Sequence, residues 1–293
     1  MESRGLVIRA VSSFYELDTG DGRIICRARG RLRLDGVEPL PGDTVSFIED
    51  PYHDGNGILT GIIERKNFFL RPNIANVDQI VFVATAARPV TEPYLIDRLS
   101  VITAEKGCGF LLCINKADLH SADALFQSYL KTEIPVIRTS AETGEGMDEL
   151  LDALSGKLSV LTGNSGVGKT SMLNRIIPSA NRQTNDLSSK YGRGRHTTRT
   201  TELFRLNQDT WVADTPGFAA LDLQTVSTVT SESLASCFAE FPVGQCRFPD
   251  CRHDREPGCA VRDCVANKTV STSRYESYIR LLHELQIAER SNK

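Results

Sequence analysis

The segment Gly163–Thr170 constrains the fold of this 293-residue chain more than any other. It fits the pattern Gly-x4-Gly-Lys-[Ser/Thr], and it stands between an apolar run at 158–162 and an amphipathic run at 170–177. A loop of this composition lets backbone N–H groups converge on an anion at the start of a helix. We therefore expect a strand, a tight loop and a helix, in that order, within an α/β fold.

Three further motifs share this region of the sequence, and their order is unusual. Asn115-Lys116-Ala117-Asp118 and Ser140-Ala141 precede the Gly163–Thr170 loop, whereas Asp214-Thr215-Pro216-Gly217 follows it. Each motif follows an apolar run, as expected for a site at the carboxyl ends of parallel strands. In an ordinary Ras-like GTPase the phosphate loop comes first and the base-reading motif comes late. The order here predicts a circularly permuted GTPase domain.

Each motif has a chemical role in a site for GTP or GDP. We expect Lys169 to bridge the β- and γ-phosphates, and Thr170 and Asp214 to hold Mg²⁺. The Asp118 carboxylate is expected to accept two hydrogen bonds that guanine donates and adenine does not. The predicted nucleotide-binding residues are Asn115, Lys116, Asp118, Ser140, Ala141, Gly163, Asn164, Ser165, Gly166, Val167, Gly168, Lys169, Thr170, Ser171, Asp214 and Gly217.

The polar segment 186–201 lies between the phosphate loop and Asp214, and its composition predicts a switch loop. A threonine there closes over Mg²⁺ and the γ-phosphate, and Thr197 and Thr198 are both candidates. His196 is either a functional residue or an ordinary exposed loop histidine. Phe218 stands where Ras-like enzymes place the glutamine that orients the attacking water, so we expect intrinsic hydrolysis to be slow.

Residues 1–68 contain short strand-like runs separated by turns rich in glycine and aspartate. This pattern predicts a small closed β-barrel of the OB type, and such barrels commonly bind nucleic acid. A barrel that only packs against its neighbour remains the alternative. The expected strands are 6–11, 13–17, 23–28, 43–48 and 58–63.

Residues 69–222 alternate apolar strands with amphipathic helices, which predicts a largely parallel sheet. Residues 223–293 are expected to form a helical, metal-binding domain, with one helix near 231–240 and another from 273 to about 287. The chain as a whole is therefore predicted to be multidomain and α/β, with the GTPase domain in the middle.

The last segment also holds Cys246-x4-Cys251-x-His253-x5-Cys259. Three thiolates and one imidazole over so short a span suit one tetrahedral structural Zn²⁺, with no position left open for a reactive water. Cys264 is an alternative fourth ligand. Clustered cysteines favour a metal over disulfides in a reducing compartment.

The bulk composition is that of an ordinary globular protein, with 40% apolar and 24% charged residues and a formal net charge of −3. The first residues lack the layout of a signal peptide, and no apolar run is long enough to span a bilayer. We expect a cytoplasmic, monomeric protein without a membrane partner.

The barrel, permuted GTPase motifs and Cys/His cluster, in that order, resemble the RsgA (YjeQ-type) family of ribosome small-subunit-dependent GTPases. The resemblance extends to 65–67, 71–72, 75–79 and 194–198. It implies an OB-fold first domain, GTP hydrolysis stimulated by the 30S subunit, contact with 16S rRNA and a role in late 30S maturation. It also maps a catalytic histidine to His196, which acts with Lys169 and Thr198.

Two other functions remain open at this point. One is a permuted GTPase that acts on the large ribosomal subunit. The other is a nucleotide-gated module that binds RNA or the ribosome with little turnover, which the apolar Phe218 keeps in consideration.

Overall fold

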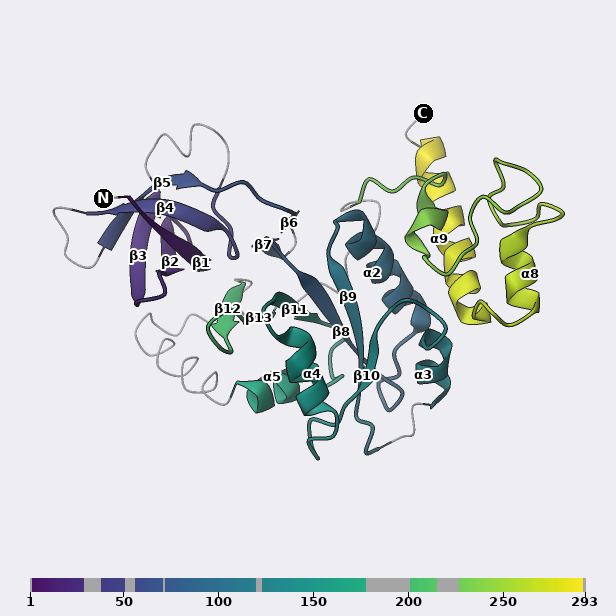
Figure 1. The fold of residues 1–293 in the computed structure, drawn as a ribbon, viewed down its shortest axis with the longest axis horizontal. Coiled ribbons are helices and arrows are strands. Elements are labelled where there is room, and N and C mark those ends of the chain that lie inside the picture. The colour runs from purple at the N-terminus through teal and green to yellow at the C-terminus, as the bar shows by residue number, and fades with distance from the viewer. Residues whose placement is uncertain are drawn as a thin grey trace. The chain divides into compact units, whose positions relative to one another are not determined.

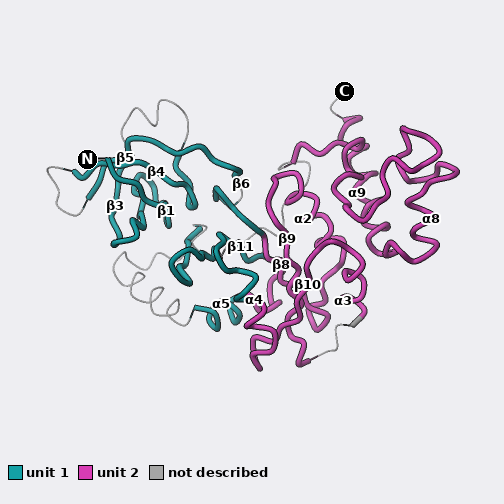
Figure 2. Tube along the Cα trace, viewed as in Figure 1, with its two compact units in different colours: residues 1–79, 151–162, 170–218 teal, residues 80–150, 163–169, 219–293 magenta. Residues whose placement is uncertain are grey.

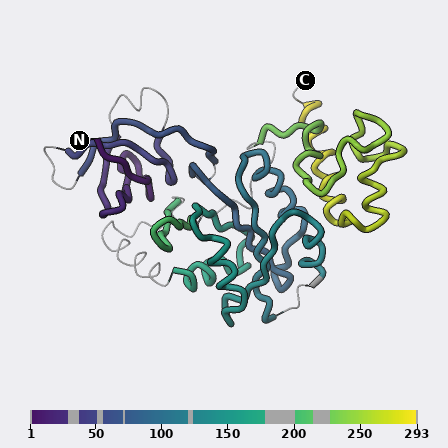
Figure 3. The backbone as a smooth tube through the Cα atoms, viewed as in Figure 1, coloured from purple at the N-terminus to yellow at the C-terminus, as the bar shows by residue number. Residues whose placement is uncertain are grey.

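The structure is a computed structural model that describes residues 2–28, 38–50, 56–70, 72–119, 123–177, 201–214 and 227–291. It divides into two compact units, each assembled from separate stretches of the chain (Figure 2). The first unit comprises residues 1–79, 151–162 and 170–218, and the second comprises 80–150, 163–169 and 219–293. Figure 3 follows the chain through both units.

The first unit begins with a closed barrel of five strands, which confirms the OB-type prediction (Figure 1). The pairing order is β1-β2-β3-β5-β4, and β4 returns to β1; only β3 and β5 are parallel. Alternating side chains fill its interior, including Val7, Leu17, Cys26 and Leu59, as the period of a strand dictates. The strands are β1 (Ser3–Val11), β2 (Phe14–Asp18), β3 (Arg23–Ala28), β4 (Thr44–Glu49) and β5 (Asn56–Ile62).

A short hairpin, β6 (Phe68–Leu70) and β7 (Asn73–Ala75), follows the barrel and was not expected from the sequence. The buried carboxylate of Asp43 accepts hydrogen bonds from Arg65 Nε and Nη2 at 2.8 and 2.7 Å. Asn76 Nδ2 donates to the Gly42 carbonyl at 2.9 Å. These bonds fix the barrel to the hairpin, because a buried charge is stable only when it is paired.

The first unit also contains three strands from the later part of the chain: β11 (Leu158–Thr162), β12 (Glu202–Arg205) and β13 (Trp211–Asp214). β11 and β13 are parallel, β12 runs antiparallel to β13, and Arg9 of β1 pairs with Glu202 of β12. α5 (Lys169–Ile176) starts directly after the phosphate loop. The strand, loop and helix predicted around Gly163–Thr170 are therefore present.

The second unit continues the α/β pattern with β8 (Gln79–Thr85), β9 (Gly109–Asn115) and β10 (Val136–Arg138), in the sheet order β10-β9-β8. Gln79 itself belongs to the first unit. β9 and β10 are parallel, and β8 is buried along its whole length. The helices α2 (Pro93–Glu105) and α3 (Asp123–Tyr129) connect these strands, and α4 (Met147–Leu154) follows β10 and continues into the first unit at Leu151.

The C-terminal part of the second unit contains α8 (Ala260–Ala266) and α9 (Thr272–Ser291). The helix expected near 231–240 is only a short 3-10 turn, η2 (Leu234–Cys237). Local bonds compete with a helix there, because Thr230 N donates to Ser233 Oγ at 3.0 Å and Ser236 Oγ donates to Ser233 O at 2.7 Å. None of the helices in the described ranges is both long and apolar enough to cross a bilayer.

A buried arginine attaches the C-terminal part to α2 and α3. Arg274 of α9 pairs with Asp97 of α2 at 2.8 Å and with Glu240 at 2.7 Å. Tyr129 of α3 donates its hydroxyl to the same Asp97 at 2.6 Å. Removing one member would leave a charge buried without its partner, so this cluster fixes how α9 packs within the second unit.

Candidate nucleotide and metal sites

The phosphate loop has a backbone shape that only glycine allows at two positions. Gly163 has a φ of 142°, and a Cβ there would collide with the Val83 carbonyl. Gly168 has a φ of 100°, and a Cβ there would overlap Asn115 Nδ2. Val167 is fully buried and anchors the loop between them. The pattern of small residues in the sequence therefore reflects close packing against β8 and β9.

Lys169 lies folded over this loop. Its Nζ donates to the carbonyls of Gly163 and Asn164, both at 2.7 Å. Ser165, Gly166, Thr170 and Ser171 are exposed. The loop thus presents its middle and the first turn of α5 to solvent, where an anion has access to backbone N–H groups.

Asn115 links three of the four motifs found in the sequence. Its side chain is almost fully buried, and Nδ2 donates to the Val167 carbonyl at 2.9 Å. Its Oδ1 accepts from the Ala141 N–H at 3.1 Å and from Thr139 Oγ1 at 3.3 Å. One amide therefore joins the Asn-Lys-x-Asp motif, the Ser-Ala motif and the phosphate loop.

Asp118 is oriented by the Ser-Ala motif. Ser140 Oγ donates to Asp118 Oδ1 at 2.5 Å and accepts from the Thr143 N–H at 3.0 Å. Lys116 has a left-handed backbone, with a φ of 64°, and its Nζ donates to the Arg88 carbonyl at 3.1 Å. The Ser140 N–H donates to Glu145 O. The N–H groups of Ser140 and Ala141 thus both have hydrogen-bond partners within the protein.

Several predicted residues lie beyond what the structure describes. β13 ends at Asp214, as expected, and only its backbone is described. Gly217, Phe218 and the switch residues His196, Thr197 and Thr198 fall outside the described residues. Their roles therefore remain predictions.

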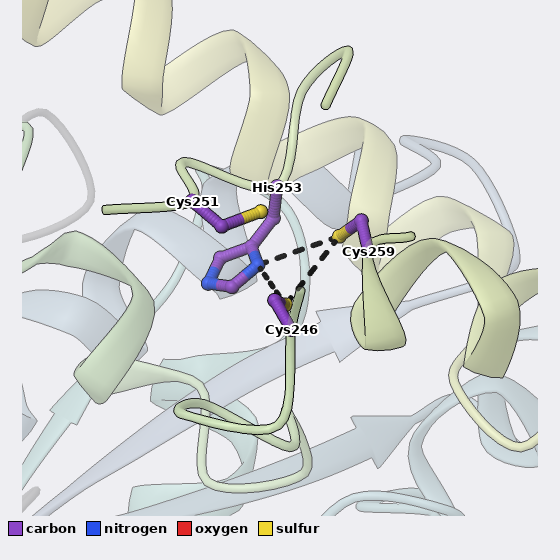
Figure 4. A group of neighbouring side chains, drawn as sticks. All are labelled: Cys246, Cys251, His253 and Cys259. Atoms are coloured by element: carbon purple, nitrogen blue, oxygen red, sulfur yellow. Dashed lines mark hydrogen bonds between the residues drawn. The ribbon is translucent and has the colours of Figure 1, made fainter. Parts of the chain in front are cut away.

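The predicted zinc ligands lie together in one group (Figure 4). Cys246 Sγ is 3.4 Å from His253 Nδ1 and 3.9 Å from Cys259 Sγ, and Cys259 Sγ is 3.5 Å from His253 Nδ1. Cys251 completes the group, with all four ligand atoms within 4.8 Å of one another. A tetrahedral Zn²⁺ with the usual bond lengths separates two sulfurs by about 3.8 Å and a sulfur from a nitrogen by about 3.6 Å. The four residues therefore fit zinc, and Cys264 is not in the group.

A carboxylate that the sequence analysis missed supports this cluster. Glu256 lies between His253 and Cys259 and accepts hydrogen bonds from the N–H groups of Arg252, Asp254 and Arg255, at 3.0 to 3.1 Å. Partial burial acts to raise the pKa of Glu256, but hydrogen bonds from its own backbone N–H and from these three N–H groups outweigh burial and hold the pKa below its ordinary value. The only signal in the sequence is an acidic residue between two ligands.

Comparison with known proteins assigns the chain to a family. The family model of the RsgA N-terminal domain matches residues 4–58, and that of the RsgA GTPase matches residues 62–224. The chain belongs to the RsgA GTPase family. Its 38% identity to the small ribosomal subunit biogenesis GTPase RsgA of Thermotoga maritima extends over 97% of both chains.

Solved structures of similar proteins agree with this family assignment. The crystal structure of YjeQ from Thermotoga maritima covers 98% of this chain and 99% of its own, at 35% identity and a TM-score of 0.82. That of YloQ, described as a circularly permuted GTPase, covers 98% of this chain and 96% of its own, at 31% identity and a TM-score of 0.78. This member of the RsgA GTPase family is therefore a GTP-hydrolysing enzyme, and the circular permutation expected from the motif order is confirmed.

Proposed function

We propose that this protein binds the 30S ribosomal subunit in the cytoplasm as a monomer and hydrolyses GTP to GDP and phosphate during late small-subunit maturation. Its curated relatives carry the name small ribosomal subunit biogenesis GTPase, which supports the small subunit as the partner. The three-domain division at 1–68, 69–222 and 223–293 is part of the same proposal.

The position of Asn115 is the main observation that supports a nucleotide site here. Its amide connects the base-reading motif, the Ser-Ala motif and the phosphate loop through bonds of 2.9 to 3.3 Å. A base-reading loop and a phosphate loop held together in this way match the two ends of one nucleotide. We assign guanine discrimination to Asp118, whose carboxylate Ser140 orients.

The phosphates and Mg²⁺ occupy the other end of the site in this proposal. N–H groups of the 163–171 segment bind the phosphate oxygens, and Lys169 exchanges its two carbonyl partners for the β- and γ-phosphates. Thr170, Asp214 and one of Thr197 and Thr198 hold Mg²⁺, and Gly217 donates its N–H to the γ-phosphate. Bound Mg²⁺ neutralises the charge that develops on the phosphates.

Phe218 has no group that orients a water molecule, so the free protein is expected to hydrolyse GTP slowly. We propose that the 30S subunit orders the switch loop and brings His196 to the attacking water. In this proposal, rapid turnover therefore depends on the ribosomal partner.

The outer face of the barrel is the proposed contact with 16S rRNA. Phe14 and Ile25 are exposed at 45% and 42%, and the Arg27 guanidinium lies 4.8 Å from the Phe14 ring centroid. Phe14 and Arg27 are directly opposite each other on β2 and β3. An aromatic ring beside a cation is a surface on which unpaired bases stack while their phosphates are neutralised.

The Cys246, Cys251, His253 and Cys259 group holds one structural Zn²⁺ in this proposal. All four positions of a tetrahedral ion are taken, so the metal stabilises the segment and performs no chemistry. The folded segment then offers a second surface to the ribosome.

The turnover of GTP by the full chain tests the function, measured alone, with purified 30S subunits and with purified 50S subunits. The proposal predicts that 30S subunits raise the rate by more than about tenfold, because a partner completes the site. A rise with 50S subunits alone would assign the protein to the large subunit. Equal rates in all three would favour a nucleotide-gated binding module.

A further inference from the structure

The loop between β8 and α2 lies beside the phosphate loop and is held in shape by its own hydrogen bonds. Thr85 N donates to Thr91 Oγ1 at 3.0 Å, Thr91 N donates to Thr85 O at 2.9 Å, and Ala87 N donates to Thr85 Oγ1 at 3.0 Å. Both threonines are buried. The two ends of the loop are therefore closed on each other, and its tip at Arg88 and Pro89 has a defined position.

Two contacts place that tip against the nucleotide motifs, and all of these residues belong to the second unit. The Arg88 carbonyl accepts a hydrogen bond from Lys116 Nζ at 3.1 Å. The Pro89 ring lies 3.4 Å from the position that a Cβ on Gly166 would take. Arg88 is thus held between the base-reading motif and the middle of the phosphate loop.

The guanidinium of Arg88 is exposed, and no residue in the described part of the chain makes an ion pair or hydrogen bond with it. Glu92, the acidic residue nearest in its own loop, is paired with Arg280 at 2.8 Å. Asp118, on the neighbouring motif, is hydrogen-bonded to Ser140. Positive charge from Arg88 and Lys116 therefore accumulates at this edge of the site, which is the arrangement that attracts a polyanion.

We propose that the Arg88 side chain binds the α- and β-phosphates of the guanine nucleotide. The position of the tip selects these two phosphates, because Lys116 marks the base end of the site and Lys169 marks the end where the γ-phosphate lies. The inference rests on the proposed nucleotide site and adds a residue that none of the four motifs contains. Because GDP and GTP share these phosphates, Arg88 contributes to the binding of both nucleotides.

The test compares the full wild-type chain with Arg88→Ala, Arg88→Lys and the control Arg290→Ala, which removes an exposed arginine near the end of α9. Dissociation constants are measured for GDP, for a non-hydrolysable GTP analogue and for guanosine as a competitor without phosphates. We expect Arg88→Ala to weaken GDP and the analogue by about tenfold each, as one charge-assisted contact suggests. Guanosine binding and the melting temperature of the nucleotide-free protein stay at their wild-type values.

Arg88→Lys keeps the charge, so its affinity for GDP and for the analogue is expected to fall by less than about threefold. The affinity of the control variant is expected to equal that of wild type. The affinity of Arg88→Ala for GDP also becomes less sensitive to salt, because an exposed ion pair is screened. Wild-type affinity for GDP in Arg88→Ala would overturn the proposal, and so would a loss confined to the GTP analogue or shared with guanosine. If the wild-type chain itself bound no guanine nucleotide, the proposed function would fail first.

Discussion

The phosphate loop and the Cys/His cluster are held in place by different kinds of interaction. The loop lies against β8 and β9, and the neutral amide of Asn115 satisfies groups from three segments at once. The cluster lies in residues 241–259, which contain no helix or strand. Individual hydrogen bonds hold its backbone: Arg247 N donates to Gly258 O at 3.0 Å, and the Tyr275 and Tyr278 hydroxyls of α9 donate to the His253 and Arg252 carbonyls at 2.8 and 2.7 Å.

This difference suggests which site needs its ligand in order to fold. A strand-bounded loop with satisfied polar groups keeps its shape when the nucleotide leaves. A segment without a helix or strand has no repeating backbone hydrogen bonds to offset its conformational entropy, so we expect metal–ligand bonds to supply much of its stability. We expect nucleotide release to alter function alone, whereas metal release unfolds part of the second unit.

The largest effect is expected from removing the metal. Cys259→Ser, or a strong chelator, should remove bound zinc and unfold the 241–259 segment, a loss of more than about 3 kcal/mol of local stability. Hydrogen exchange of the backbone amides measures the local stability of each part of the chain separately. Cys264→Ser is the matched control and should keep both zinc and protection; equal zinc loss in the two variants would contradict the ligand set.

A smaller effect is expected from Asn115→Ala. The change leaves the Val167 carbonyl and the Ala141 N–H without their shared partner, and the phosphate and base loops lose their link. Lost and unsatisfied bonds of this kind cost about 2–3 kcal/mol, so GDP affinity should fall by roughly 30- to 140-fold while the zinc content is unchanged. Isothermal titration checks this, with the exposed Asn73→Ala as control. An unchanged affinity for GDP would show that nucleotide binding does not depend on the link made by Asn115.

The smallest effect is expected from Glu256→Gln. The amide cannot accept three N–H bonds as strongly as the carboxylate does, so the metal-binding segment should lose about 1 kcal/mol. Competition with a chelator should then show zinc held about fivefold less tightly, since 1.4 kcal/mol corresponds to tenfold. Glu276→Gln on the exposed side of α9 is the control. An affinity equal to wild type would mean that the N–H groups are satisfied equally well by an amide.

The sequence was sufficient to predict the features that depend on local pattern. The five barrel strands alternate apolar and polar residues, and the phosphate loop requires glycine where β8 and the Asn115 side chain approach it. The four metal ligands fall within one short stretch of chain. In each case the residues that define the feature are close together in sequence or follow a fixed period.

Features that depend on distant contacts could not be predicted in this way. Arg274 pairs with Asp97, which is 177 residues away, and a single arginine in a helix gives no hint of such a partner. The Ala141 N–H donates to Asn115 Oδ1, which is 26 residues away, and the local sequence does not predict this bond. Local polar bonds at Ser233 shortened the helix expected near 231–240.

The central claim is that motifs in permuted order assemble one guanine-nucleotide site, and base preference tests it most directly. The affinities of wild type and Asp118→Asn for GDP and XDP are measured side by side, with the exposed Asp152→Asn as control. The account predicts that wild type and control prefer GDP, and that Asp118→Asn prefers XDP, because an amide donates to the xanthine carbonyl where the carboxylate accepted from guanine. An undiminished preference for GDP in Asp118→Asn would contradict it.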